Sequence, residues 1–288
     1  MNFILMLKAA ILGVVEGLTE FLPISSTGHL IVTQSFLGLQ GAFWDSFQVA
    51  IQFGAIIAVM WEFRERITDV VGGALRREPK AMQFMINVVV ATIPVLLVAA
   101  VFGKQIQAVL FNPVAVALAF IVGGLIIFWA ESRQKNQQAR VMSLDDMSLM
   151  DAFKVGMVQT LAVLFPGTSR SGATIIGGMF FGISRQVATH FSFFLAMPVL
   201  FIACIKGLWD MRHTSKAFVH NGVAMNLTGS DMMVLFLLGF VFALISAFVC
   251  VRWLLKFVSN HNFIGFAWYR VVFGLFILLT YAMGWMRW

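Results

Sequence analysis

Residues 13–30 read GVVEGLTEFLPISSTGHL, an apolar stretch that a proline and three hydroxyl residues interrupt. Glu16 and Glu20 are four positions apart, so both carboxylates project from one face of a helix, where they either share a proton or hold a cation. Pro23 lacks a backbone N–H and therefore ends or bends that helix. The hydroxyl residues favour the start of a second helix, whose free N–H groups suit an anion such as phosphate. The stretch predicts a broken helix with cation ligands and a phosphate site.

The composition of the whole chain is that of a membrane protein. Of its 288 residues, 60% are hydrophobic and 11% are charged, whereas a typical soluble domain carries about 25% charged residues. Its apolar runs of about 20 residues predict membrane helices and not the shorter alternating strands of a barrel. The net charge of +7 does not indicate nucleic-acid binding, because the basic residues lie in loops between apolar runs. Cys204 and Cys250 lie inside apolar runs, and we expect them to pack there without forming a disulfide.

Six apolar runs are predicted to cross the membrane. They cover about residues 47–63, 82–103, 113–131, 187–208, 232–251 and 262–286. Two further apolar segments, about 3–41 and 152–184, are interrupted by Pro23 and by Pro166, and each half is too short for a core of about 30 Å. We therefore predict an all-α polytopic membrane protein with six transmembrane helices and two re-entrant helix pairs.

The two broken segments resemble each other. A shift of 143 positions aligns five identical pairs and places Glu16 opposite Gln159. The identical pairs are Gly13 with Gly156, Val15 with Val158, Leu18 with Leu161, Pro23 with Pro166, and Ser26 with Ser169. The alignment predicts one membrane domain built from two repeats, about 1–140 and 141–288. Because three spans follow each broken segment, the second repeat is inverted, and such repeats often form a site near the bilayer midplane.

Loop charges predict the orientation in the membrane. One loop carries Arg64, Arg66, Arg76, Arg77 and Lys80, and a second, two spans later, carries Arg133, Lys135 and Arg140. The positive-inside rule assigns both loops to the cytoplasm. The first broken segment then enters from the outer face, the second enters from the cytoplasm, and both termini lie outside.

The second broken segment contains PGTSRSG at residues 166–172. It repeats the break and the hydroxyl residues, but its charged residue is Arg170. An arginine in a membrane requires an anionic partner, and no carboxylate lies within one turn of Arg170 on its own segment. We expect the partner to be Glu16, Glu20 or a ligand phosphate, so that the first repeat supplies acids and an imidazole and the second a phosphate clamp.

Several of these residues also have purely structural interpretations. Helix capping alone would explain Ser25, Ser26 and Thr27. His29 lies one turn after that cluster, and we favour an acid, base or nucleophile role for it. Three polar residues within predicted spans are expected to be mainly structural: Gln48 and Gln52, which form an i, i+4 pair, and Arg270.

EGLTEFLPISSTGH at residues 16–29 and PGTSRSG resemble the two signature motifs of the undecaprenyl-diphosphate phosphatases, the bacitracin-resistance membrane phosphatases of bacteria. The six spans, the repeat and FSFFLAMP at residues 191–198 extend the resemblance to nearly the whole chain. The resemblance implies a hydrolase that removes the terminal phosphate from a C55 isoprenyl diphosphate. It also implies a divalent metal, Mg²⁺ or Ca²⁺, and a site that opens to the periplasmic side of the bacterial inner membrane.

By position, Glu16 and Glu20 match the paired acids of that family and would hold the metal, and Ser26, His29 and Arg170 match its other catalytic residues. We expect Ser26 to attack phosphorus and His29 to handle its proton, while attack by His29 itself stays open. The expected phosphate ligands are Ser25, Thr27, Thr168, Ser169 and Ser171.

A transporter or flippase for lipid phosphates is the alternative function, because inverted repeats also serve alternating access. The concentration of acid, hydroxyl and imidazole in one motif favours the enzyme. The sequence leaves open the metal identity, the lipid chain length and the oligomeric state, a homodimer included.

Overall fold

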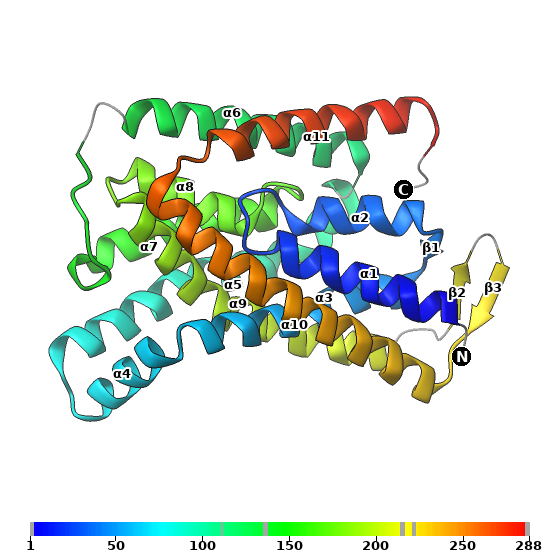
Figure 1. Ribbon diagram of the computed structural model, residues 1–288, viewed down its shortest axis with the longest axis horizontal. Coiled ribbons are helices and arrows are strands. Elements are labelled where there is room, and N and C mark those ends of the chain that lie inside the picture. The colour runs from blue at the N-terminus through cyan, green and yellow to red at the C-terminus, as the bar shows by residue number, and fades with distance from the viewer. Residues whose placement is uncertain (1–2, 111, 135–137, 214–216, 221–222, 286–288) are drawn as a thin grey trace.

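A computed structural model describes residues 3–110, 112–134, 138–213, 217–220 and 223–285 (Figure 1). The first half of the chain forms α1 (Phe3–Thr19), α2 (Ser26–Phe36), β1 (Leu39–Gln40), α3 (Ala42–Glu62), α4 (Arg64–Leu75), α5 (Pro79–Leu110) and α6 (Pro113–Gln134). The second half forms the 3-10 turn η1 (Leu144–Asp146), α7 (Leu149–Leu164), α8 (Arg170–Phe180), α9 (Arg185–His213), β2 (Ala217–His220), β3 (Val223–Asn226), α10 (Gly229–Asn260) and α11 (Ile264–Ala282).

The predicted membrane spans are confirmed. Within the described residues, six helices are long and apolar enough to cross a bilayer, namely α3, α5, α6, α9, α10 and α11. Each overlaps one predicted run, although several helices extend further than predicted. For example, α10 begins at Gly229 because Thr228 and Asp231 form a capping box that satisfies its first N–H groups. The chain is a multi-pass α-helical membrane protein.

Helix α4 and a small sheet were not predicted from the sequence. The basic loop after α3 contains the helix α4, which buries only Val70 and Gly73 and so lacks the long apolar face by which a helix is recognised. Strands β1, β2 and β3 form an antiparallel sheet in that order. The prediction of an all-α membrane protein is confirmed, and this small sheet, which lies beside the start of α1 (Figure 1), is an addition that the sequence did not predict.

Each predicted broken segment is a pair of helices. α1 and α2 are separated by residues 20–25, and α7 and α8 by residues 165–169. α2 and α8 both contain 11 residues, and the residue before each has a positive φ angle, 71° at Ser25 and 74° at Ser169. α1 and α2 lie in the half of the molecule that holds the termini, and α7 and α8 lie in the other half (Figure 1).

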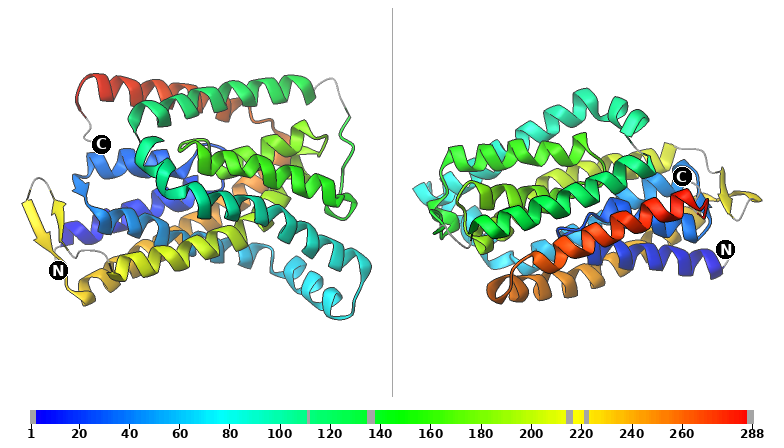
Figure 2. Two further views of the ribbon diagram at one scale, coloured as in Figure 1. Left: turned by 180° about the vertical axis from the view of Figure 1, so that it is seen from behind. Right: turned by 90° about the horizontal axis from the view of Figure 1, so that it is seen from above.

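The first helix of each broken segment is held by a full span of the opposite half. α1 packs along α10, and α7 packs along α5, while α6 lies against α11 and α3 lies between α9 and α10. Figure 2 shows the same arrangement from behind and from above. Gly13 allows the close approach of α1, because a Cβ there would lie 2.3 Å from the carbonyl oxygen of Gly239.

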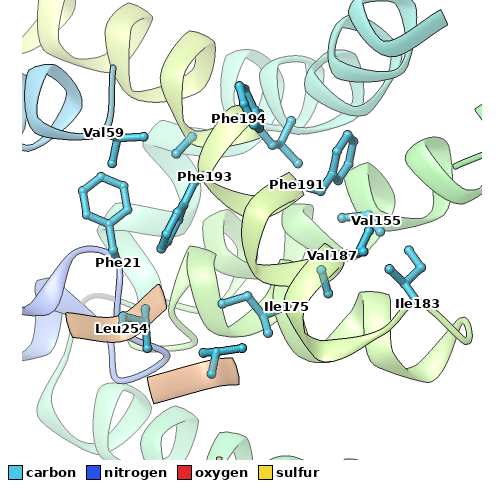
Figure 3. Packing of buried hydrophobic residues seen from close by; sticks show 14 of the residues in the cluster. Phe21, Val59, Val155, Ile175, Ile183, Val187, Phe191, Phe193, Phe194 and Leu254 are labelled. Atoms are coloured by element: carbon cyan, nitrogen blue, oxygen red, sulfur yellow. The ribbon is translucent and has the colours of Figure 1, made fainter. Parts of the chain in front are cut away.

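The break after α1 is anchored in the hydrophobic core. Phe21 is fully buried and meets Phe193 edge to face, with ring centroids 5.2 Å apart. Val59 and Leu254 belong to the same cluster (Figure 3). Burial of an aromatic side chain contributes about 2 kcal/mol or more, so Phe21 fixes the backbone next to Glu20.

The two basic loops share one end of the molecule. Arg66 of α4 forms an ion pair with Asp145 of η1, which joins the loop after α3 to the loop after α6. The start of α1 and the end of α11 lie at the opposite end (Figure 1). Both loops therefore lie at one end of the molecule, and their assignment to the cytoplasm stays a prediction.

Candidate active site

The two broken segments meet at their breaks. The Ser171 hydroxyl donates to the carbonyl oxygens of Leu22, at 2.7 Å, and Glu20, at 3.3 Å. Ser169 Oγ lies 3.4 Å from the Leu22 oxygen and also accepts from the Gly172 N–H at 3.0 Å. The hydroxyl residues of the second break thus satisfy carbonyl groups that the first break releases from helical bonding.

The Glu20 carboxylate joins residues from both segments. Its Oε2 accepts a hydrogen bond of 2.5 Å from the Ser26 hydroxyl, and its Oε1 lies 3.0 Å from Arg170 Nη2. The Glu20 and Arg170 side chains are 6% and 10% exposed, so the ion pair is shielded from solvent. The acid that the sequence leaves undecided between Glu16 and Glu20 is therefore Glu20.

Arg170 is held from two further sides. Its Nη1 donates to the carbonyl oxygen of Ser192 on α9 at 3.1 Å, and its guanidinium carbon lies 5.7 Å from the centre of the Phe21 ring. Removing one partner of a buried ion pair costs about 3–5 kcal/mol, because the other charge is left unpaired. The position of Arg170 is therefore set by Glu20, Ser192 and Phe21 together.

Arg270 of α11 ties both breaks to α6. It is fully buried and donates to the carbonyl oxygens of Pro23 at 3.1 Å, Thr168 at 3.0 Å and Gly167 at 3.0 Å. Two further bonds reach the carbonyls of Ala119 and Phe120 on α6, at 2.9 and 3.3 Å. Each of these partners is a main-chain carbonyl, which agrees with the structural role expected for Arg270.

A cavity of about 160 Å³ lies at the junction of the two breaks. At about 30 Å³ for each water molecule, it has room for a group the size of a phosphate. Its lining includes Gln52, near the middle of α3, and Leu200, near the middle of α9. The other lining residues are Glu20, Ser25, Ser26, Thr27, Ala162, Gly167, Ser169 and Arg170.

The predicted site residues fall into two groups. Glu20, Ser25, Ser26, Thr27, Ser169 and Arg170 line the cavity, whereas Glu16, His29, Thr168 and Ser171 are not among its lining residues. Ser171 is bound to the first break, and the Thr168 carbonyl is bound to Arg270.

Ser26 and His29, which the sequence pairs for proton transfer, make separate hydrogen bonds in the structure. The Ser26 hydroxyl donates to Glu20, and both ring nitrogens of His29 have other partners. His29 Nδ1 lies 2.7 Å from the Ser25 carbonyl oxygen, and Nε2 lies 2.7 Å from the Tyr269 hydroxyl. These two contacts occupy both ring nitrogens of His29, and proton transfer between Ser26 and His29 stays a prediction.

Glu16 is the group best suited to a cation. It is fully buried, and within the described residues neither of its carboxylate oxygens has a hydrogen-bond partner. Buried carboxylates are normally paired or bound to a metal. The described residues contain no group of three or more His, Cys, Asp or Glu side chains placed to hold a metal. A magnesium site needs fewer protein ligands, because Mg²⁺ is often held by one or two carboxylates with water and substrate phosphates.

Sequence reasoning missed the importance of Gln52 and Tyr269. Gln52 lines the cavity, whereas its i, i+4 spacing from Gln48 favours helix packing and leaves a place in the site as the lesser alternative. Tyr269 binds His29 from 240 positions away, and an isolated tyrosine in an apolar span gives no signal of that contact. The adjacent Arg270, a cation inside a predicted span, was the sequence signal that this part of α11 is unusual.

The fold and the site define a class: multi-pass α-helical membrane proteins in which two broken helix pairs bring a carboxylate, a hydroxyl and a guanidinium together at a cavity. The sequence profile described as "Bacitracin resistance protein BacA" matches residues 9–276, and the chain belongs to that family.

Similar proteins extend over the full length of the chain. The chain is 54% identical to "Undecaprenyl-diphosphatase 1" of Burkholderia lata over 290 residues, which cover 100% of both proteins. It is 52% identical to "Undecaprenyl-diphosphatase" of Cupriavidus necator over 306 residues, covering 100% of this chain and 99% of the relative. The corresponding protein of Ralstonia nicotianae is 51% identical, with 97% of each chain covered.

Proposed function

We propose that the chain is a membrane phosphatase that hydrolyses undecaprenyl diphosphate to undecaprenyl phosphate and inorganic phosphate. The family and relatives that are 51–54% identical over nearly their full length carry this assignment. In a bacterium this activity returns the lipid carrier to peptidoglycan synthesis and confers bacitracin resistance. The names of the relatives do not favour the alternative of a lipid-phosphate transporter.

The proposed reaction is based on one observation: the Glu20 carboxylate binds both Ser26 and Arg170. Ser26 Oγ attacks the terminal phosphorus, and its proton passes to Glu20 as the new P–O bond forms. The bond from phosphorus to the bridging oxygen breaks, and undecaprenyl phosphate leaves. Water then attacks the phosphorus of phosphoserine, the bond from phosphorus to Ser26 Oγ breaks, and inorganic phosphate is released. The proton held by Glu20 returns to Ser26 Oγ, and one proton of the attacking water passes to solvent. Arg170 neutralises the negative charge on the phosphoryl oxygens in both steps.

The residues predicted to bind phosphate are proposed to act in two ways. Ser25, Thr27 and Ser169 line the cavity and are suited to bind phosphate oxygens directly. Thr168 and Ser171 are proposed to act by holding the loop, because their recorded bonds are to Arg270 and to the first break.

Glu16 and Glu20 are proposed to hold a divalent cation, Mg²⁺ or Ca²⁺. The unpaired, buried carboxylate of Glu16 supports this site. A bound cation would neutralise charge on the diphosphate and so assist its cleavage.

The membrane arrangement is also a proposal. We propose that α1 with α2 and α7 with α8 are re-entrant pairs of an inverted repeat, with boundaries at about 1–140 and 141–288. The reciprocal packing of α1 on α10 and α7 on α5, and the equal lengths of α2 and α8, support it. We further propose the bacterial inner membrane, with the cavity open to the periplasm and both termini periplasmic, supported by the basic residues at the opposite end. A homodimer stays a prediction that light scattering in detergent would test.

The central experiment measures phosphate release from a C55 isoprenyl diphosphate by the purified protein with Mg²⁺ or Ca²⁺. Substrate labelled on the terminal phosphate should leave an acid-stable phosphoserine on Ser26 after rapid quenching. Ser26→Ala should abolish both signals, while Thr33→Ala on the same helix should retain them. Full turnover by Ser26→Ala would exclude Ser26 as the nucleophile, and trapped phosphohistidine would indicate His29. No release by the wild type under any metal condition would reject the enzymatic function and favour transport.

A further inference from the structure

His29 and Tyr269 form a connection between α11 and the peptide that carries Ser26. The Ser25 carbonyl can only accept, so the His29 Nδ1 atom 2.7 Å away must carry a proton. In the neutral ring Nε2 is then an acceptor, and the Tyr269 hydroxyl, also at 2.7 Å, donates to it. Tyr269 thereby selects the tautomer in which Nδ1 holds the Ser25 carbonyl.

Aromatic rings fix the plane of the His29 ring. The Phe273 ring is stacked on it, with centroids 4.3 Å apart and planes 12° apart. The Tyr269 ring is nearly parallel to it at 5.6 Å, and Phe120 lies 5.7 Å away. His29 is 8% exposed and does not line the cavity. The plane of the His29 ring is therefore fixed outside the cavity lining, and both of its nitrogens have hydrogen-bond partners.

The held carbonyl belongs to a strained residue. Ser25 has φ 71° and ψ 100°, a conformation that residues with a Cβ rarely adopt. Such a conformation costs about 1–3 kcal/mol and persists only where the surroundings impose it. The peptide between Ser25 and Ser26 sets the direction in which the Ser26 side chain leaves the backbone. The His29 contact therefore helps to aim the Ser26 hydroxyl.

The second broken segment stabilises its equivalent strained residue, Ser169, through a different contact. Ser169 has nearly the same conformation, with φ 74° and ψ 117°, but its own hydroxyl caps the helix by accepting from the Gly172 N–H. The Ser25 side chain makes no such capping bond to α2. The first repeat thus lacks the internal support that the second has, and the contact through His29 takes its place.

We propose that Tyr269 is a positioning residue for the phosphatase reaction, acting through the His29 imidazole on the Ser25 carbonyl and so on Ser26. The proposal rests on the proposed function. It assigns His29 to positioning as well, because the proton of Ser26 already has an acceptor in Glu20.

The test compares the two tyrosines of the chain, which both lie on α11. Tyr269→Phe keeps the stacked ring and removes only the hydroxyl, and we expect kcat to fall about tenfold with KM changed less than twofold. Tyr281→Phe, the matched control in the last turn of α11, should keep wild-type kcat. Unfolding temperatures in detergent should be equal for the two variants. Equal kcat for both variants, or a tenfold rise in KM with kcat unchanged, would overturn the proposal.

A second comparison separates positioning from proton transfer. His29→Asn places an amide donor near the position of Nδ1, whereas His29→Ala removes the donor. We expect the Asn variant to be about tenfold more active than the Ala variant, and Tyr269→Phe to have no further effect in the Asn background. If His29 transfers the proton, the Asn and Ala variants will be equally inactive and the proposal fails. A wild-type protein without phosphatase activity would instead reject the proposed function, before any variant is compared.

Discussion

Glu20 and Arg170 are 150 positions apart in the sequence and form a buried ion pair of 3.0 Å. The pair joins the break between α1 and α2 to the start of α8. Because the same carboxylate also accepts the Ser26 hydroxyl, the proposed nucleophile and the proposed phosphate clamp share one partner. The geometry of the site therefore depends on how precisely the two broken segments meet.

Loss of either partner of this pair should reduce catalysis severely. We expect Glu20→Gln and Arg170→Ala each to lower kcat at least ~100-fold, about 2.7 kcal/mol of barrier. The kcat of the double variant should be little lower than that of either single variant, because each change breaks the same ion pair. The exposed ion pair of Glu62 and Arg252 provides the control, and Glu62→Gln with Arg252→Ala should stay within twofold of wild type. Additive losses in the double variant would show that Glu20 and Arg170 act independently.

Glu16→Gln should weaken binding of the divalent cation. Chelation of the wild-type protein should stop phosphate release, and added Mg²⁺ or Ca²⁺ should restore it. The cation concentration for half-maximal activity should rise at least about tenfold in Glu16→Gln and stay unchanged in Glu65→Gln, an exposed acid of α4. Thermal stabilisation by the cation provides a readout without turnover. An unchanged cation dependence in both assays would remove Glu16 from the metal site.

Gly123→Ala should disturb the carbonyl network of Arg270. A Cβ at Gly123 would lie 2.2 Å from Arg270 Nη2, and this guanidinium cannot move without losing bonds to both breaks. Overpacking of this kind costs about 1–3 kcal/mol, so we expect a lower unfolding temperature and lower activity. Gly265→Ala on α11 meets no atom within 4 Å and should leave both unchanged or raise stability slightly. Equal behaviour of the two variants would contradict the structural role of Arg270.

The ion pair of Arg140 and Asp151 should make the folding stability of the protein depend on pH in the acid range. Burial of Asp151 acts to raise its pKa, but hydrogen bonds from Arg140 and Ser148 outweigh it and lower that pKa below the ordinary value. Because the pKa of Asp151 is lower in the folded state, the ion pair stabilises the folded state at pH values above the unfolded pKa of about 3.9. This contribution is lost as the pH falls through the folded pKa.

Thermal unfolding in detergent should therefore show Asp151→Asn less stable than wild type at pH 7, with a difference that shrinks below about pH 4. Asp69→Asn, a change at an exposed position of α4, should match wild type throughout. A difference that stays constant down to acid pH would contradict the electrostatic origin.

The sequence predicts the parts of this structure that have strong local causes. Pro23 and Pro166-Gly167 mark the two breaks because proline removes a helical hydrogen bond. The position of Arg170 within an apolar region indicates an anionic partner, and the predicted inverted repeat limits the expected partner to Glu16, Glu20 or a ligand. Only the packing of Phe21 and Ser171 around the break decides that Glu20 is the partner.

The sequence does not predict features that depend on the main chain. The orientation of His29 follows from the strained carbonyl of Ser25 and from Tyr269, and neither leaves a pattern in the sequence. The partners of Arg270 are carbonyl groups, which every residue type possesses. A side chain that binds backbone therefore shows no complementary residue elsewhere in the chain.

The contacts of Arg270 also set an order of events during biosynthesis. The guanidinium that donates to the carbonyls of Pro23, Gly167 and Thr168 belongs to α11, which is translated after α1 to α10. A nascent chain that has inserted everything up to α10 already contains the acids, the hydroxyls and Arg170, but the clamp for its two breaks has not yet been translated. The clamp would then form only after α11 has been synthesised, and a translation product interrupted before α11 would lack it.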